Sequence, residues 1–314
     1  MTARWHILGL GWLLTCMPML ACERSDPPVG GASTKTQTSV EPTVYVVNYP
    51  LQFFVERIGG EAVEVVFPAP EDEDPAYWKP DADTIAAFQK ADLILLNGAS
   101  YARWVEHAIL PASKVVDTSK AFKDRYIELE GAVKHAHGPE GEHAHRSVAF
   151  TTWLDPTLAL QQAEAIGNRL TRMLPDRAEE LARNFEALKR DLESLDTRLA
   201  DLTKDGIETP LLAAHPVYQY VARRYGLNIK SLDWEPHQVP TAKQWAELDK
   251  LIQDHPANWM IWEAAPSTET IDKLRERSIR CGVFDPCGNV PSNGDYLQVM
   301  QRNIEALIPV FRPQ

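Results

Sequence analysis

Four histidines and two glutamates lie within one stretch of eleven residues. The histidines are His135, His137, His143 and His145. Neutral imidazoles are good Zn²⁺ ligands, and histidine-rich tracts on loops collect the ion at modest affinity. The alternative is a polar loop that binds nothing. Because the whole chain has nine histidines, four of them in one stretch favour contact with metal.

Two further reactive side chains, Cys281 and Cys287, lie close together near the C-terminus. In an oxidising compartment such a pair is compatible with a disulfide. Residues 282–285 have the composition of a strand, however, and four extended residues cover about 13 Å, so the chain would have to turn back sharply. The sequence leaves open whether these cysteines form a disulfide or remain thiols.

The N-terminal region, residues 1–21, has the features of a signal peptide. Arg4 is its only charged residue, and the 17-residue run behind it is shorter than the ~20 residues of a spanning helix. The run ends in Met19-Leu-Ala-Cys22, which is similar to the lipobox of bacterial lipoproteins, so we expect Cys22 to be acylated. The alternative is an ordinary signal peptide followed by a chance cysteine. Residues 22–43 are Pro/Gly-rich and polar, which is typical of a tether. Together these segments predict an extracytoplasmic, membrane-anchored lipoprotein, in the periplasm or at the cell surface.

The composition excludes several classes of protein. It is 44% hydrophobic and 24% charged, which is typical of a globular chain and not of a disordered or polytopic membrane protein. The net charge of −12 opposes contact with nucleic-acid phosphates and is compatible with attraction of cations. No nucleophile–base pair or nucleotide-binding loop has the required spacing, so the sequence predicts no enzyme.

Two regions alternate short apolar runs with helical patterns, residues 44–154 and 205–314. Such alternation predicts a mostly parallel sheet with helices on its faces. The expected strands are 44–48, 63–67, 93–97, 114–117, 210–214, 228–232, 259–263 and 281–285. The expected helices include 83–90, 241–254, 268–277 and 296–307. The predicted fold class is therefore α/β, with two lobes.

The region between the lobes, residues 155–204, has no strand pattern and predicts connecting helices. Asp155-Pro156 is a helix start, with Asp as the N-cap and Pro at the first helical position. A second helix, from Asp176 to about Thr203, carries an apolar stripe. The stripe consists of Leu181, Phe185, Leu188, Leu192, Leu195, Leu199 and Leu202. We expect this helix to lie across both lobes; the alternative is a self-associating coiled coil.

Short motifs along the mature chain resemble one known family. They include Trp153-Leu-Asp-Pro before the middle helix, His215-Pro-Val-Tyr after a strand of the second lobe, and Phe284-Asp-Pro after the last strand. In this order they resemble the cluster A-I solute-binding proteins, which deliver Zn²⁺ or Mn²⁺ to ABC importers. The resemblance implies two α/β lobes joined by a long helix, a metal site between them and an ABC permease as partner. We expect the protein to be a monomer.

The resemblance also implies four metal ligands, of which this chain keeps two. His215 and Asp285 occupy ligand positions of the second lobe. In the first lobe Ala76 and Thr151 stand where the family has histidine, and Lys79 replaces a glutamate. Zn²⁺ takes about four donors, so His215 and Asp285 alone would hold it weakly. The alternative for the histidine is ordinary packing, and for the aspartate the capping of a turn.

Three other features can complete the donor set. The acidic segment Glu71–Asp74 precedes the Ala76 position, although such segments are more often solvated loops. Cys287 would be a thiolate ligand if reduced, whereas an inert thiol or a disulfide is the simpler alternative. The histidine-rich loop, residues 134–146, lies where zinc-binding members of the family carry similar insertions.

These features predict a solute-binding protein that captures Zn²⁺ between two lobes for a metal importer. Mn²⁺ is less favoured because imidazole suits zinc and carboxylate-rich shells suit manganese. Two alternatives remain open. In one, Tyr77, Trp78 and Lys79 hold a metal chelate or small organic ligand, although the aromatic residues Tyr77, Trp78 and Trp153 could also simply close the cleft. In the other, the chain is an adhesin or metal buffer that uses only the histidine-rich loop.

Overall fold

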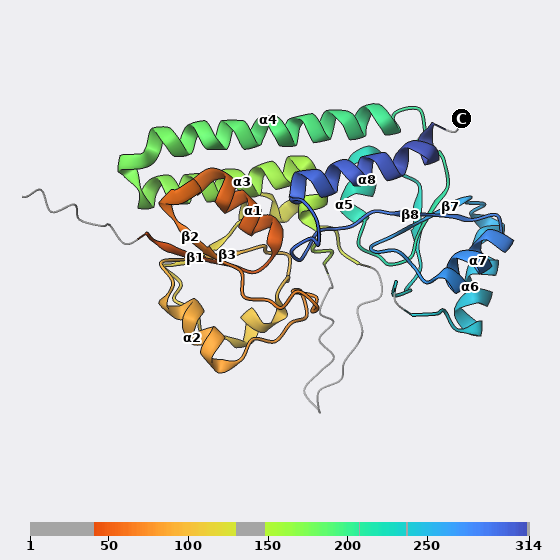
Figure 1. Cartoon of the computed structure of the whole chain (residues 1–314), viewed down its shortest axis with the longest axis horizontal. Coiled ribbons are helices and arrows are strands. Elements are labelled where there is room, and N and C mark those ends of the chain that lie inside the picture. Colours follow the sequence, from red (N-terminus) through yellow and green to blue (C-terminus); the bar gives the residue numbers. More distant parts are fainter. Residues whose placement is uncertain (1–40, 130–147, 207, 237, 313–314) are drawn as a thin grey trace, which may run out of the picture. The chain divides into compact units, whose positions relative to one another are not determined.

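The computed structural model describes residues 41–129, 148–206, 208–236 and 238–312 (Figure 1). From residue 41 onward the chain forms one compact unit. The predicted signal peptide, residues 22–40 of the predicted tether, with Cys22, and the histidine-rich loop lie outside the described residues.

The first lobe is built on a four-stranded parallel sheet in the order β2-β1-β3-β4. Its strands are β1 (Thr43–Val46), β2 (Glu64–Val66), β3 (Leu93–Leu96) and β4 (Val115–Asp117). Two helices follow strands of this sheet, α1 (Tyr49–Gly59) and α2 (Ala82–Lys90). Each begins at a side-chain cap, since Asn48 accepts from Leu51 N and Asp81 accepts from Thr84 N.

The second lobe repeats this arrangement with the order β6-β5-β7-β8. Its strands are β5 (Leu211–Ala213), β6 (Ile229–Ser231), β7 (Trp259–Trp262) and β8 (Arg280–Val283). Its helices are α5 (Gln219–Tyr225), α6 (Ala242–Asp254), α7 (Thr268–Glu276) and α8 (Tyr296–Phe311). All eight expected strands are confirmed, and so is the predicted α/β class.

Two long helices connect the lobes, α3 (Pro156–Met173) and α4 (Ala178–Thr203). The predicted cap is confirmed, because the Asp155 side chain accepts from Thr157 N and Pro156 is the first helical residue. Figure 1 shows α4 running along α3 and α8, and α4 also contacts α1. Its stripe is buried in these contacts except for the half-buried Phe185. The apolar stripe therefore packs against helices of the same chain, which confirms the prediction that this helix lies across both lobes.

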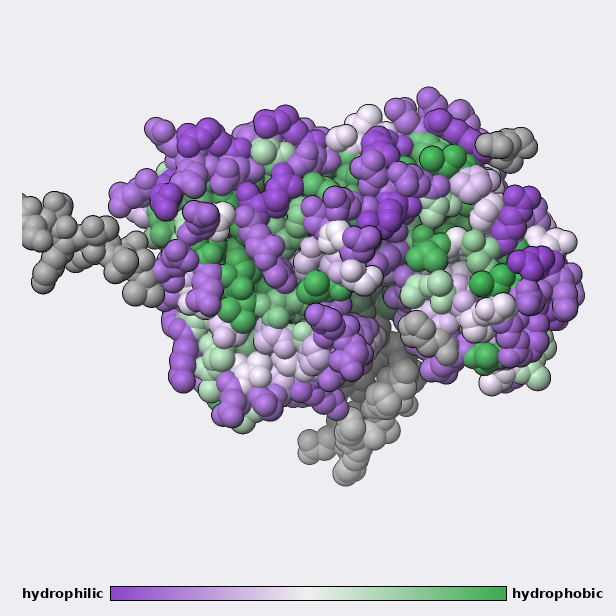
Figure 2. Space-filling model, viewed as in Figure 1, coloured by the Kyte–Doolittle hydropathy of each residue, from purple (hydrophilic) through white to green (hydrophobic). Residues whose placement is uncertain are grey.

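The main hydrophobic core is continuous through both lobes, because one cluster of buried side chains includes residues of β1, α4 and α8. The face seen in Figure 2 is mainly hydrophilic along α4 and around α6 and α7. Within the part of the chain that the structure describes, no helix has the length and apolarity needed to cross a membrane.

Candidate functional site

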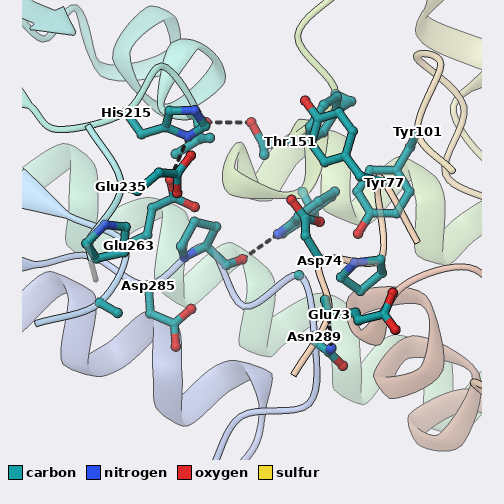
Figure 3. A pocket seen from close by; sticks show the side chains of 18 of the residues that line it. Glu73, Asp74, Tyr77, Tyr101, Thr151, His215, Glu235, Glu263, Asp285 and Asn289 are labelled. Carbon is teal, nitrogen blue, oxygen red and sulfur yellow. Dashed lines mark hydrogen bonds and ion pairs between the residues drawn. The ribbon is translucent and has the colours of Figure 1, made fainter. Parts of the chain in front are cut away.

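A cleft of about 620 Å³ is lined by residues of both lobes (Figure 3). Six of its lining residues are acidic and one is a histidine. They are Asp72, Glu73, Asp74, Glu235, Glu263, Asp285 and His215. Because these side chains concentrate negative charge and oxygen donors in one place, the cleft is suited to a cation.

His215 follows β5 and is oriented by a neighbouring strand. β5 and β7 pair in parallel, with Ala213 opposite Ile261, so the residues that follow both strands meet at the same edge of the sheet. There His215 Nδ1 lies 2.7 Å from Glu263 Oε1. An imidazole whose Nδ1–H donates to a carboxylate presents its other nitrogen, Nε2, as a lone-pair donor, which is the usual arrangement of a metal-binding histidine.

The charge around His215 favours its protonated form. The hydrogen bond to Glu263 is the main cause that raises the pKa of His215; burial opposes it, and the charges of Glu263, Glu235 and Asp233 add to it. A metal ion would have to displace this proton, so binding at His215 must depend on pH.

Asp285 follows β8 and is held by the backbone around it. Asn303 on α8 accepts from Asp285 N at 2.9 Å and donates to Asp285 O at 2.7 Å. The Asp285 carboxylate accepts from Cys287 N at 2.7 Å. Burial raises the pKa of Asp285, and the Glu263 charge adds to this shift.

The first lobe contributes Asp74 to the opposite wall. Asp74 accepts from Ala76 N at 2.9 Å. Loss of hydration within the cleft is the main cause that raises its pKa. Glu263 and Glu235 raise it further, while His215 lowers it. The pKa of Asp74 therefore responds to charges of the second lobe across the cleft. In the acidic segment Glu71–Asp74, the last three residues line the cleft and Glu71 does not.

The two positions that lost histidine have different surroundings. Ala76 is 2% exposed and packs into the hydrophobic core. Thr151 does line the cleft, but its hydroxyl donates to Val217 O of the second lobe at 2.5 Å. Lys79 does not line the cleft and belongs to a second pocket, so its ammonium does not oppose a cation there.

Neither cysteine adds a donor to the cleft. Both are free thiols, so the disulfide that the sequence left open is absent. The physical reason is that they pack in separate places: Cys287 lies in the main core, while Cys281 packs against a smaller cluster in the second lobe. Burial raises the pKa of the Cys281 thiol to about 11 and that of Cys287 further. Cys287 is therefore a protonated thiol that lies outside the cleft lining.

The donors of the cleft do not form a closed coordination sphere. Among the described residues, no three His, Cys, Asp or Glu side chains are arranged so that they could hold a metal ion together. Figure 3 shows His215, Glu235, Glu263 and Asp285 on one side, with Asp74 and Tyr77 on the other. A cation in this cleft would need these side chains to approach it, with water filling the remaining positions.

Sequence reasoning missed Glu263 and Glu235. Glu263 directly follows β7, and His215 follows the neighbouring strand β5. The sequence could have indicated that the two residues meet only if the order of the strands had been known. Glu235 follows the buried Trp234 in a segment that is neither helix nor strand.

Several hydrogen bonds join the two walls. Trp153 Nε1 donates to Pro286 O at 2.6 Å, and the Tyr296 hydroxyl donates to Trp153 O at 2.8 Å. Asn289 donates to Pro70 O and Glu73 O at 2.7 and 2.9 Å. Trp153 is 1% exposed. These bonds hold the lobes together on the side of the cleft where Asp285 lies.

Comparison with known families gives a match over residues 44–309 with the family described as zinc-uptake complex component A, periplasmic (ZnuA). The zinc-binding protein AdcA of Streptococcus pyogenes serotype M3 is 25% identical over 292 residues, which cover 86% of this chain and 56% of AdcA. The chain thus spans little more than half the length of that relative.

Two solved structures share the fold. The metal-dependent lipoprotein YcdH from Bacillus subtilis superimposes with a TM-score of 0.74 at 22% identity, covering 86% of this chain and 99% of YcdH. The Zn(II)-bound ZnuA-like domain of Streptococcus pneumoniae AdcA gives 0.74 at 21% identity, covering 87% of this chain and 99% of that domain.

Proposed function

The chain belongs to the ZnuA family of periplasmic zinc-uptake components, and from this premise we propose that it is the solute-binding protein of an ABC importer for zinc. The proposed cargo site is the cleft that contains His215 and Asp285. The protein would capture the cation there and present it to a permease that docks on both lobes. This role requires binding and release, and no catalysis.

The observation that carries this proposal is the His215–Glu263 pair at the edge of an acidic cleft. The pair orients His215 so that Nε2, which lies 3.6 Å from Asp233 Oδ1, becomes a metal donor once its proton is displaced. Around it, burial is the main cause that raises the pKa values of Asp74 and Asp285, and charge repulsion adds to both shifts, from Glu263 and Glu235 on Asp74 and from Glu263 on Asp285. A divalent cation would relieve this repulsion and use the same oxygens as ligands.

The donor chemistry bears on which metal is bound. One imidazole among many carboxylates is a shell in which oxygen donors dominate, and such shells suit manganese better than zinc. The family and the Zn(II)-bound structural relative support zinc. We therefore keep zinc as the cargo and make manganese the competitor in the test.

The proposal also includes two features that lie outside the described residues, the N-terminal cysteine and the histidine-rich loop. We propose that Cys22 carries the lipid anchor of a monomeric, extracytoplasmic protein. His135, His137, His143 and His145 would collect zinc and pass it to the cleft. Replacement of Cys22 by alanine should release the protein from the membrane fraction, which detergent-free fractionation of cells would show.

Calorimetric titration of metal-free protein, residues 23–314, tests the proposal. We expect one tight zinc site and weaker binding of manganese in a competition titration. His215→Ala should remove the tight site, whereas deletion of residues 135–145 should leave it in place and remove only weaker binding. Loss of all zinc binding on the deletion alone would identify a metal buffer instead. Asp254→Asn, a change at an exposed carboxylate outside both pockets, is the control.

A further inference from the structure

A second pocket, of about 740 Å³, lies within the first lobe on the other side of Tyr77 from the metal cleft. It is formed by the loop before α2, by α2 itself and by a short 3-10 helix, Arg103–His107. Its volume falls within the range of pockets that hold small organic molecules. Metal capture makes no use of it.

The walls of this pocket are aromatic. Tyr77, Trp78 and Trp104 all line it. Trp104 is 8% exposed and is fixed by Phe88, whose ring centroid lies 4.8 Å away. Tyr77, by contrast, is 48% exposed. A rigid indole at the base and an accessible phenol at the rim offer flat apolar surface to a planar ring.

The same pocket gathers three basic side chains, Lys79, Arg103 and His107. Within the described ranges, none of them makes a side-chain hydrogen bond or an ion pair; the Arg103 guanidinium lies over the Tyr77 ring, 4.8 Å from its centroid. Elsewhere Arg224 binds Asp196 through two nitrogens, and so does Arg277 with Asp249.

Lacking a partner is not by itself unusual, because other described cations such as Lys90 also make no side-chain hydrogen bond or ion pair. What distinguishes Lys79 and Arg103 is that they lie together in a pocket whose lining has no acidic residue, in a chain whose net charge is −12. An arginine whose guanidinium lies over an aromatic ring still has N–H groups to donate to a carboxylate. Aromatic walls beside free cations match a ligand that has both a ring and a negative charge.

We propose that this pocket binds a small planar organic anion of the aromatic carboxylate class. Arg103 and Lys79 hold the carboxylate, His107 donates a further hydrogen bond, and the ring packs against Tyr77 and Trp78. An inorganic anion would leave the aromatic walls unused, and a neutral ring would leave the cations unpaired. The ligand is either the free carboxylate or its metal chelate, since Tyr77 also borders the acidic cleft.

Titration calorimetry with 3-hydroxy-2-naphthoate, a fused-ring carboxylate that also chelates metals, tests this proposal on the mature protein. We expect one binding site per chain. The methyl ester of the same compound has the ring without the charge, and its binding should be at least about tenfold weaker, because a charge-assisted hydrogen bond is lost. Arg103→Met and Lys79→Met should each weaken binding of the naphthoate by about 10- to 100-fold.

Lys90→Met is the matched control, because Lys90 lies on α2 outside the pocket lining. It should bind the naphthoate as the parent does. Titrations in EDTA and with one equivalent of Zn²⁺ separate the two sources of the ligand. Binding in EDTA identifies the free carboxylate, and binding only with Zn²⁺ identifies the chelate. The proposal would be overturned by equal affinity for the ester, by undiminished binding of the naphthoate in both Arg103→Met and Lys79→Met, or by no binding in either buffer.

Discussion

The two walls of the metal cleft are built in different ways. The second-lobe wall takes His215, Glu263 and Asp285 from the ends of adjacent parallel strands, so the sheet itself brings them together. The first-lobe wall depends on loops, and there Ala76 faces the core while the Thr151 hydroxyl is used by Val217 O. The position of a donor that follows a strand is fixed by the sheet, whereas the position of a donor on a loop depends on the conformation of that loop.

The largest expected effect on zinc affinity appears when one residue of each wall is replaced separately and the two variants are compared. His215→Ala should weaken zinc binding by about 100-fold or more, since loss of even an outer-shell partner costs about 10- to 100-fold. Thr151→Ala should change it by no more than about fivefold, because its hydroxyl already donates to Val217 O and a neutral hydrogen bond contributes about 1 kcal/mol. Competition with a fluorescent zinc chelator measures both. Comparable losses would mean that both walls supply ligands.

The next effect isolates the residue that orients the histidine. Glu263→Gln keeps the side-chain shape but removes the charge, so the pKa of His215 should fall and zinc affinity should drop by about 10- to 100-fold. NMR titration of the His215 ring and the zinc competition assay provide two independent readouts. Glu235→Gln is the comparison, because Glu235 also lines the cleft and adds its charge to the raised pKa of His215 but makes no hydrogen bond to it, so it should lower that pKa less than Glu263→Gln does. A lower affinity with an unchanged His215 pKa would contradict the orienting role.

The same contrast explains how far the sequence predicted this molecule. Strands and helices followed from periodicity, and the start of α3 followed from Asp155-Pro156, because these signals are local. The stripe of α4 predicted a buried helix face without saying which helices would cover it. In each case the information lies within a few turns of chain.

The rest depended on the order of strands and on loop conformation. Glu263 is 48 residues from His215, and only the pairing of β5 with β7 brings the two together. Lys79 belongs to a loop, so its type did not reveal which pocket it lines. Cys281 and Cys287 are near in sequence, but the extended β8 and its continuation carry them into different clusters.

A third prediction concerns the bonds that join the walls. Trp153→Phe removes the buried indole N–H that Pro286 O accepts. An unsatisfied buried group costs about 1–3 kcal/mol, so the free energy of unfolding should fall by about that amount in urea. Trp234→Phe is the control, since its indole is as buried as that of Trp153 and its Nε1 makes no hydrogen bond among the described residues. If the two variants lost the same stability, the loss would belong to ring size rather than to the bond between the walls.

The smallest expected effect is on stability, and it comes from an ion pair between α6 and α7 of the second lobe that lies away from the metal donors. Asp249 on α6 pairs with Arg277 beside α7, and this hydrogen bond lowers the pKa of Asp249. A carboxylate with a lowered pKa stabilises the fold above its unfolded-state pKa, and this contribution is lost as the pH falls through the folded-state pKa. Asp249→Asn should therefore reduce stability at pH 7 by less than about 1 kcal/mol, because the pair is exposed. The difference from the parent should vanish in acid.

Zinc affinity of Asp249→Asn should follow that of the parent at every pH where both are folded. Acid should still weaken zinc binding in both proteins, because protons compete for His215 and for the carboxylates of the cleft. Thermal unfolding and zinc competition, measured from pH 7 to pH 4, would test this together. A variant that lost zinc at a higher pH than the parent would show that acid acts through the α6–α7 framework. Parallel curves would instead place the proton sensitivity on the strand-end donors, as their hydrogen bonds and raised pKa values predict.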